Sequence, residues 1–310
     1  MPALDSLLIV TKRTPLEELI ARFNSRAQAQ FYIEHLGGSF DEYESQHARY
    51  EAALAALRKL LPRGVKQQII ERSFLPTFQF SGHELVITLG PDGLVVNTAK
   101  YLRGQPLVAV NPDPAHIDGV LLPFTVADAP AAVRGVLKNQ ATARLVTMAE
   151  ARLNDGQSLL AFNDLFIGVR SHVSARYLIR AGDREEHHSS SGIIVSTGVG
   201  ATGWLSSMFN MANGMLAQFA STEAPLERPR PAWDADQLMF VVREPFVSKT
   251  SGAAVVCGAV TPGAPLVIRS EMPDGGVIFS DGVEADFLAF NAGATATIGL
   301  AAQKARLVAG

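Results

Sequence analysis

The apolar pattern of this chain changes after about residue 125, and that change limits the folds open to it. Before that point, short apolar runs alternate with helical spacing. The strand candidates are 7–10, 65–70, 85–89 and 107–110, and the helix candidates are 15–23, 41–61 and 94–101. Strands that alternate with helices indicate parallel βαβ units. The first part of the chain therefore predicts an α/β domain built on a parallel sheet.

Beyond residue 125, a helix over 129–138 is followed by short strand patterns separated by turn residues such as Asp-Gly. The predicted strands are 144–149, 159–169, 176–181, 193–196, 238–242, 253–256, 266–268 and 277–279. One helix, from about Gly203 to Phe219, interrupts them, and the Pro-containing segment Thr222 to Asp236 predicts an exposed loop. This spacing is typical of a β-rich sandwich or barrel.

Length and composition agree with two domains, because 310 residues exceed the usual size of about 150 residues for one. The chain is 47% hydrophobic and carries 27 basic against 30 acidic residues, which disfavours a nucleic-acid partner. The single cysteine, Cys257, excludes an internal disulfide framework and fits the cytoplasm. We expect neither a signal peptide nor a membrane span, since no apolar stretch reaches about 18 residues.

The turn 90–93, with the sequence Gly-Pro-Asp-Gly, lies between a predicted strand and a predicted helix. In open α/β sheets, ligands bind beyond the carboxyl ends of the strands. Glycines there can bring backbone N–H groups and a helix N-terminus to a phosphate, and Asp92 could act as a base or hold a metal. The alternative is that Pro-Asp-Gly is merely a turn. The residues of a P-loop are absent.

The segment 196–204 follows a predicted strand and begins a helix. Gly198, Gly200 and Gly203 match the Gly-x-Gly-x-x-Gly pattern of dinucleotide-binding folds, and Glu223 follows about 20 residues later. No second parallel strand lies between them to carry that acid, which disfavours a dehydrogenase. Small residues and hydroxyls before a helix favour a turn that faces a ligand, and the alternative is a close-packed corner between strand and helix.

Asn163 and Asp164 interrupt an otherwise apolar strand. If they are buried, their amide and carboxyl groups need partners, which the hydroxyls or base edge of a ligand could supply. A β-bulge or a turn is the alternative.

Other polar groups are weaker candidates. We interpret the segment 186–188, with the sequence Glu-His-His, as a solvated loop. His116 and Asp118 lack an obvious third metal ligand, and Cys257 lies among small apolar residues that are typical of a core. No Gly-x-Ser-x-Gly motif indicates a serine hydrolase.

In their order and surroundings, these segments resemble the NAD kinases, most of all the mitochondrial-type branch. The family's Gly-Gly-Asp-Gly corresponds to 90–93, and its Gly-Val-Asn to 109–111. Its Leu-Asn-Glu/Asp corresponds to 162–164, its Ser-Thr loop to 196–204, and its late Asp-Gly to 281–282. The resemblance spans about Leu7 to Val308.

The resemblance implies an α/β N-terminal domain, 1–127, and a β-sandwich NAD-binding domain, 128–292, with the ligand between them and a tail of about 293–310 that returns to the first domain. It implies transfer of the γ-phosphoryl of ATP, or of polyphosphate, to the 2′-hydroxyl of the adenosine ribose of NAD. Such transfer depends mostly on positioning and charge stabilisation. Members of the family commonly form homodimers or homotetramers.

Carried onto this sequence, the resemblance assigns three groups of residues. Asp92 would orient or accept the hydroxyl proton close to the Mg²⁺ that accompanies ATP, and Gly90 and Gly93 would contact phosphate. The NAD pocket would be formed by Asn163, Asp164, Thr202, Gly203, Trp204 and Ser207.

Four residues depart from the family pattern. Pro91 replaces a glycine and removes a backbone N–H. Leu94 replaces a threonine, and Val199 and Ala201 replace more polar residues. Two hypotheses follow: an NAD kinase, or a catalytically weak NAD(P)-binding homologue with a regulatory role. A lipid kinase of the diacylglycerol-kinase type, which shares a similar aspartate motif, is a third.

Overall fold

The computed structural model describes residues 4–220 and 225–310, so Thr222 and Glu223 lie outside the described residues. The chain divides into two compact units. The first comprises Met1–Arg144 with Arg306–Gly310, and the second comprises Leu145–Ala305.

The first unit is a sheet with helices on both faces. Its strands are β1 (Ser6–Thr11), β2 (Lys66–Glu71), β3 (Glu84–Leu89), β4 (Pro106–Asn111), β5 (Phe124–Thr125), β6 (Ala143–Val146) and β19 (Ala305–Val308). They are ordered β2-β1-β3-β4-β19-β6, with β5 beside β4. The pairs β1–β2, β1–β3, β3–β4, β4–β5 and β4–β19 are parallel. The predicted α/β domain is confirmed.

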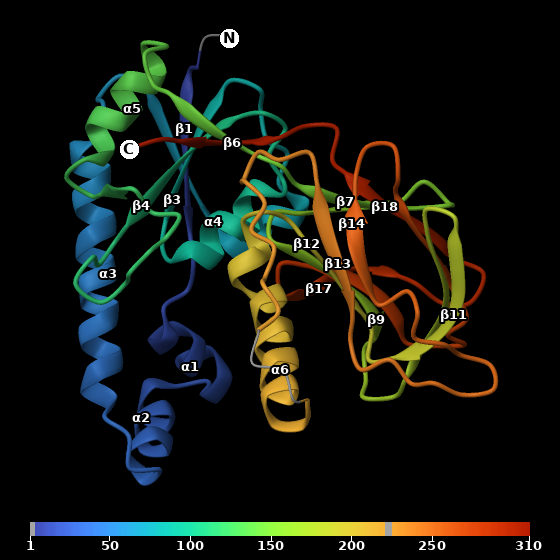
Figure 1. Cartoon of the computed structure of the whole chain (residues 1–310). Coiled ribbons are helices and arrows are strands. Elements are labelled where there is room, and N and C mark those ends of the chain that lie inside the picture. Colours follow the sequence, from blue (N-terminus) through green and yellow to red (C-terminus); the bar gives the residue numbers. More distant parts are fainter. Residues whose placement is uncertain (1–3, 221–224) are drawn as a thin grey trace. The chain divides into compact units, whose positions relative to one another are not determined.

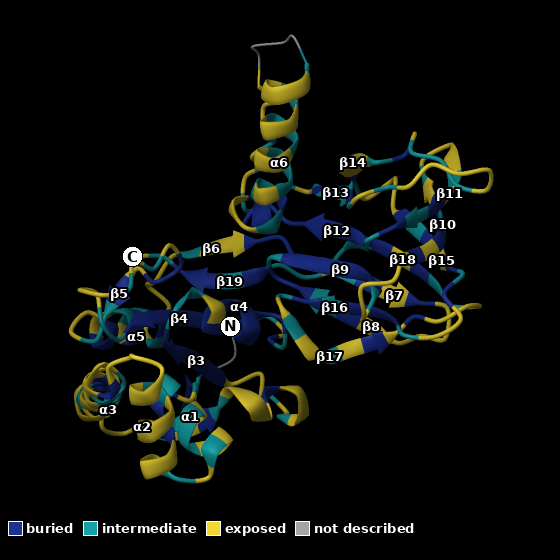
Figure 2. Ribbon diagram, turned by 90° about the horizontal axis from the view of Figure 1, so that it is seen from below, coloured by how far each residue is buried: buried dark blue, intermediate teal, exposed yellow. Residues whose placement is uncertain are grey.

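The helices of this unit are α1 (Pro15–Phe23), α2 (Arg26–His35), α3 (Phe40–Leu60), α4 (Asp92–Ala99) and α5 (Ala129–Leu137), with the 3-10 helix η1 (Arg72–Thr77). Figure 1 shows α3 and α5 on one side of the sheet and α4 on the other. Apolar residues of α3 and α5, including Leu57 and Val133, share a core with Leu7, Ile87 and Val108 of the strands. β3, β4 and α4 are almost wholly buried (Figure 2).

The second unit is a sandwich of two six-stranded sheets. One is ordered β11-β10-β15-β18-β7-β8, and the other β14-β13-β12-β9-β16-β17. The strands are β7 (Ala149–Leu153), β8 (Ser158–Ala161), β9 (Asp164–Val169), β10 (Ala175–Ala181), β11 (Arg184–Ser190), β12 (Ile193–Ser196), β13 (Leu238–Val242), β14 (Cys257–Val260), β15 (Leu266–Ser270), β16 (Gly276–Ser280), β17 (Val283–Ala289) and β18 (Thr295–Leu300). The pairings within both sheets are antiparallel.

Alternate residues of these strands form the sandwich core. Leu165 and Ile167 of β9 are in it with Tyr177 of β10 and Ile268 of β15. The helix α6 (Trp204–Phe219) follows the 3-10 turn η2 (Gly200–Thr202), and of its residues Leu205 is buried. Figure 2 shows most of α6 as exposed or intermediate.

The boundaries of the two units differ from those that the sequence indicated. The helix α5 adds Ala129, Val133 and Val136 to the core of the first sheet, so the first unit continues to Arg144 rather than ending at 127. The returning tail is also shorter than 293–310, because β18 belongs to the second unit and β19 alone joins the first sheet.

Several local predictions were wrong. The segment 186–188 lies on β11 rather than in a loop, and His188 is buried. The strand predicted over 253–256 lies at 257–260 instead, where Cys257 is exposed rather than in the core. The sequence patterns also missed α2, β17, β18 and β19.

Candidate functional site

The turn 90–93 joins the end of β3 to the start of α4. The amide of Gly90 donates to the carbonyl of Val110 at 3.2 Å, which holds the turn on β4. Pro91 is the residue before the helix and has no N–H, so the amides of Asp92 and Gly93 remain to face a ligand. A Cβ added at Gly93 would meet no atom within 4 Å, so packing does not explain this glycine.

Asp92 is the first residue of α4, and its carboxylate is held by backbone. Its Oδ2 accepts the amide of Val120 at 2.9 Å, and its Oδ1 accepts that of Leu121 at 2.9 Å. Each carboxylate oxygen has a second lone pair, so the group can still accept a hydroxyl proton. Asp92 therefore has a fixed orientation, which either a catalytic base or a loop anchor requires.

A pocket of about 190 Å³ opens at the carboxyl ends of β1, β3 and β4. The loops that follow these three strands contribute Lys12, Arg13, Pro91, Pro112, Asp113, His116 and Ile117. The rest of the wall is formed by Gln46, Arg49 and Tyr50 of α3, with Thr14 and Pro15 at the start of α1. Ligands of parallel sheets bind at such strand ends, so this pocket is the candidate ligand-binding position in the first unit.

Tyr50 joins two of these loops. Its hydroxyl donates to the carbonyl of Leu89 at 2.9 Å and accepts the amide of Lys12 at 3.4 Å. Burial raises the pKa of Tyr50 to about 12, so the hydroxyl stays protonated and keeps both contacts.

In the second unit, Asn163 and Asp164 lie at a break between β8 and β9. Asp281, in the hairpin turn between β16 and β17, accepts three successive amides there: those of Phe162 at 3.0 Å, Asn163 at 2.7 Å and Asp164 at 3.2 Å. Asp281 and the following Gly282 both have a left-handed backbone conformation, with φ angles of 55° and 70°. This turn therefore sets the geometry of the Asn163–Asp164 segment.

The two predicted polar residues have unsatisfied or unusual chemistry. The Oδ1 of Asn163 is buried and has no partner among the residues that the structure describes. Burial, with the nearby negative charge of Asp281, raises the pKa of Asp164 to about 7. Buried polar atoms ordinarily have partners, so the orphaned amide oxygen fits a ligand contact at this segment.

The Ser-Thr segment 196–204 packs directly on this break. The Thr197 hydroxyl donates to the carbonyl of Phe162 at 2.7 Å, and its amide donates to that of Asn163 at 2.9 Å. A Cβ at Gly200 would lie 2.1 Å from the backbone carbonyl oxygen of Asn163, and one at Gly198 would lie 2.4 Å from the backbone carbonyl oxygen of Ala232. The close-packed-corner alternative thus accounts for these two glycines.

Gly203 differs from these two glycines, because the nearest atom to an added Cβ there is 3.4 Å away. Gly203 and Thr202 are exposed, as is Ser207 in the first turns of α6. These three predicted NAD residues are therefore exposed to a ligand. Gly198 and Gly200, which were named only for the glycine pattern, serve packing instead.

Asp164 shares a sheet face with an aromatic cluster. Because side chains alternate along a strand, Asp164 and Phe166 point to the same face of β9, while Leu165 and Ile167 enter the sandwich core. The Phe166 ring stacks on Trp204 with centroids 5.7 Å apart and on Phe279 at 4.8 Å.

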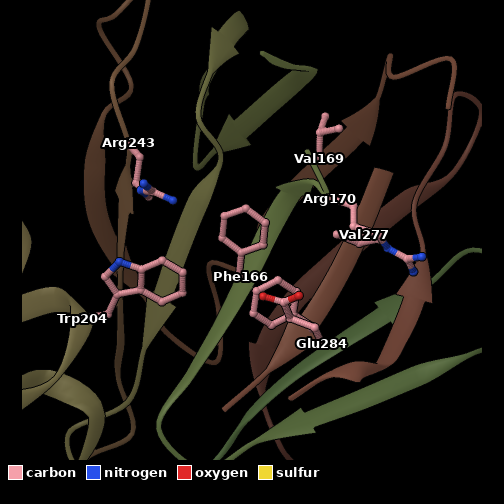
Figure 3. Close-up of a pocket in the computed structure, with 8 residues that line it drawn as sticks. Phe166, Val169, Arg170, Trp204, Arg243, Val277 and Glu284 are labelled. Atoms are coloured by element: carbon pink, nitrogen blue, oxygen red, sulfur yellow. The ribbon is translucent and has the colours of Figure 1, made fainter. Parts of the chain in front are cut away.

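A pocket of about 170 Å³ lies over this cluster. Figure 3 shows the Trp204 indole beside Phe166, with the Arg243 guanidinium near the indole, at 5.3 Å from its centroid. Arg170 and Glu284 complete the polar part of the wall. Aromatic faces beside cations suit a planar ring that carries phosphate.

Sequence reasoning identified Asn163, Asp164 and Trp204, and the structure places them on one part of the second unit. Sequence reasoning missed the roles of Phe166, Arg243 and the carboxylate of Asp281. Within the described ranges, no group of three or more His, Cys, Asp or Glu side chains could hold a metal ion. Nor does any helix there combine the length and apolarity that a membrane span needs.

Comparisons with known proteins identify the fold. No protein-family model matches the sequence, and neither does any curated protein. Among solved structures, yeast NADH kinase complexed with NADH is similar, with 13% identity, a TM-score of 0.57, and coverage of 98% of this chain and 83% of that one. An NAD kinase from Archaeoglobus fulgidus in complex with ATP has 14% identity and a TM-score of 0.57, covering 98% and 93%. The chain has the NAD kinase fold.

Proposed function

We propose that this protein is an NAD kinase that transfers a phosphoryl group from ATP or inorganic polyphosphate to the 2′-hydroxyl of the adenosine ribose of NAD. The observation that carries the proposal is the second unit's ligand face. There, the orphaned oxygen of Asn163 and the carboxyl of Asp164 lie at the start of β9. Two residues further along this strand, Phe166 lines an aromatic pocket together with Trp204 and Arg243. The fold is that of proteins solved with NADH and with ATP.

Each residue of this face has a role in NAD binding. Asn163 and Asp164 would hydrogen-bond the adenosine, since a carboxyl group with a pKa of about 7 can donate or accept near neutral pH. Trp204 would offer a stacking surface, and Thr202, Gly203 and Ser207 would line the entrance at the start of α6. These contacts position the ribose hydroxyl, which is the main demand of phosphoryl transfer.

Asp92 would act as the base, and Gly90 and Gly93 would border the phosphates. The two amides that hold its carboxylate fix the direction from which it can accept the 2′-hydroxyl proton. Mg²⁺ would arrive with the donor phosphates. We expect it to be held mainly by them, with Asp92 as the nearest protein carboxylate in the turn.

The first experiment is to incubate the purified chain with NAD, Mg²⁺ and either ATP or polyphosphate, and to follow NADP with an NADP-specific dehydrogenase. Asp92→Asn should abolish NADP formation while NAD binding, measured by calorimetry, persists. Asp128→Asn is the matched control, because Asp128 also holds a backbone amide in the first unit, that of Thr125 at 3.2 Å. Loss of activity in both variants would indicate a structural effect instead.

The alternative is an NAD(P)-binding homologue with a regulatory role. Two observations favour it: Pro91 offers no N–H to a phosphate, and both oxygens of Asp92 already have backbone partners. NAD binding without any NADP formation, with either donor, would select this function.

The resemblance to the mitochondrial-type branch and the cytoplasmic location remain predictions. So does assembly as a homodimer or homotetramer, which light scattering on the purified chain would measure.

A further inference from the structure

Arg228 lies in the segment that leads from α6 to β13, and the proposed function does not yet use it. We propose that its guanidinium binds the pyrophosphate of the dinucleotide at the start of α6. The identity of the ligand as a dinucleotide rests on the proposed function, whereas the binding of a phosphate group by Arg228 does not.

The guanidinium of Arg228 lacks a counter-charge. The side chain is partly buried, and it forms no ion pair within residues 4–220 and 225–310. Its Nε is buried and has no hydrogen-bond partner among the same residues. The helix against which it lies, α6, contains no charged residue, so the guanidinium does not neutralise an acid there. Because buried charges are ordinarily paired, this arrangement points to an anion that binds from outside the chain.

Two contacts hold this segment along α6. Asn213 makes both hydrogen bonds with the backbone of Leu226, since its Nδ2 donates to the carbonyl at 3.2 Å and its Oδ1 accepts the amide at 2.7 Å. Two residues further on, Nη1 of Arg228 donates to the Oγ of Ser206. Ser206 and Asn213 are seven residues apart, which is about two helical turns, so they lie on one side of α6. The segment therefore runs back beside the helix (Figure 1) and brings the guanidinium to its first turn.

The first turn of a helix is an unfavourable place for an unpaired cation. Ser206 is the third residue of α6, and the capping residue, Gly203, offers no side chain to the first amides. A helix N-terminus carries a partial charge of roughly +0.5, so it repels the guanidinium unless an anion lies between them. The cation, rather than the helix end, identifies the ligand as an anion, because water alone can satisfy terminal amides.

A phosphate group fits this position. The Ser206 contact uses Nη1, so Nη2 of Arg228 is left to donate, and arginine binds phosphate through such parallel N–H groups. The predicted NAD residues Thr202, Gly203 and Ser207 are exposed at the same end of the helix. A dinucleotide held there through its adenosine has its pyrophosphate next to that nucleoside. Arg228 would therefore bind the charged part of the substrate, and Ser206 is a positioning residue.

The test is calorimetry on the full chain with ADP-ribose, which keeps the adenosine and the pyrophosphate but lacks nicotinamide. Arg228→Gln should weaken ADP-ribose binding about tenfold or more, because charge-assisted hydrogen bonds to the pyrophosphate are lost. Binding of adenosine, measured by NMR titration, should stay within twofold. The matched control is Arg230→Gln, which removes the same charge from an exposed position two residues away and should leave both affinities within twofold.

Three results would overturn the proposal. Equal weakening of ADP-ribose binding in Arg228→Gln and Arg230→Gln would reduce the effect to net charge. Equal weakening of ADP-ribose and adenosine binding in Arg228→Gln would show that the substitution disturbs the whole ligand face. If Arg228→Gln weakens the binding of ATP but not that of ADP-ribose, the phosphate group belongs to the phosphoryl donor and the assignment to the dinucleotide is wrong.

Two further readouts separate this proposal from the kinase function. In the NADP assay, Arg228→Gln should raise the KM for NAD about tenfold and leave the KM for the donor unchanged. NADP formation with an unaltered KM for NAD would exclude the Arg228 contact and keep the kinase. Inorganic pyrophosphate is the second probe: if it binds the wild type but not Arg228→Gln, while no NADP forms, the anion site stands and the kinase function falls.

Discussion

Asp281 is the residue on which the geometry of the Asn163–Asp164 segment depends most. Asp281→Asn would place an NH₂ group against one of the three amides that the carboxylate now accepts. Because a buried donor left without an acceptor costs about 1–3 kcal/mol, we expect the free energy of unfolding to fall by that amount. NAD binding should weaken with it. Urea denaturation and calorimetry would measure both.

Asp183→Asn is the control for that variant, since Asp183 lies exposed in the hairpin turn between β10 and β11. It should leave both quantities unchanged. Unaltered stability in Asp281→Asn would mean that the three amides find other acceptors.

Asp164 should make stability depend on pH. Its pKa is about 7 in the folded chain and near 3.8 when unfolded, so the folded state keeps a proton that the unfolded state has lost between these values. Its contribution is full below about 3.8 and is lost as the pH rises through about 7. Relative to wild type, Asp164→Asn should therefore gain up to about 1.4 kcal/mol per pH unit over this window.

Urea denaturation of both proteins at half-unit steps from pH 4.5 to about 8.5, where stability curves are measurable, would test this. The difference should level off above about pH 7. A difference that stays constant with pH would show that Asp164 ionises normally in the folded chain.

At this scale the sequence predicted the polar residues but not their partner. An amide and a carboxyl inside an apolar run are visible locally, and so Asn163 and Asp164 could be named. Their contact with Asp281 spans more than a hundred residues and depends on a hairpin turn, which no local pattern encodes. For the same reason the raised pKa of Asp164 could not be foreseen.

At the scale of elements, replacement by alanine should change stability in opposite directions at two glycines, one in the turn before α6 and one inside this helix. Gly200→Ala would put a Cβ 2.1 Å from the backbone oxygen of Asn163, and such overpacking costs about 1–3 kcal/mol. Gly214→Ala, inside α6, would meet no atom within 4 Å and should stabilise by about 0.5–1 kcal/mol. Thermal unfolding of the two variants would compare them.

A stable Gly200→Ala protein would mean that the 196–204 segment can move away from Asn163. The glycines of this segment would then be a matter of ligand contact rather than of packing.

The strand β11 shows why element predictions failed where they did. Its residues are mostly polar, so neither alternation nor apolar runs marked it. It forms because β10 pairs with it over seven residues and because His188 is buried against Tyr177, with its Nε2 2.7 Å from Glu186 Oε2. The long apolar strands β3 and β4 needed no such tertiary context and were predicted almost residue for residue.

At the scale of the whole molecule, β19 should control the stability of the first unit alone. Leu307 is buried and pairs with Leu107 of β4. Leu307→Ala should cost about 2–5 kcal/mol. Hydrogen exchange should then accelerate in β3 and β4, while the amides of β9 and β12 keep their rates. Leu36→Ala, at an exposed position of the first unit, is the control.

Equal acceleration of hydrogen exchange in both units would show that they unfold as one.

The fold class itself followed from the sequence, because the change from alternating helices and strands to closely spaced strands persists over long stretches. The exact division did not, because α5 and β19 join the first unit through contacts that are remote in sequence.

The place of β19 between β4 and β6 has a consequence for the order of events during synthesis. The ribosome must translate the entire second unit before β19 emerges. The second unit is contiguous and can close its sandwich as soon as it is made, whereas the first sheet waits with a gap at β4. Although β5 pairs with the end of β4, the start of β4 has no partner on this side for that interval, and such an exposed strand edge is the kind of surface that chaperones protect.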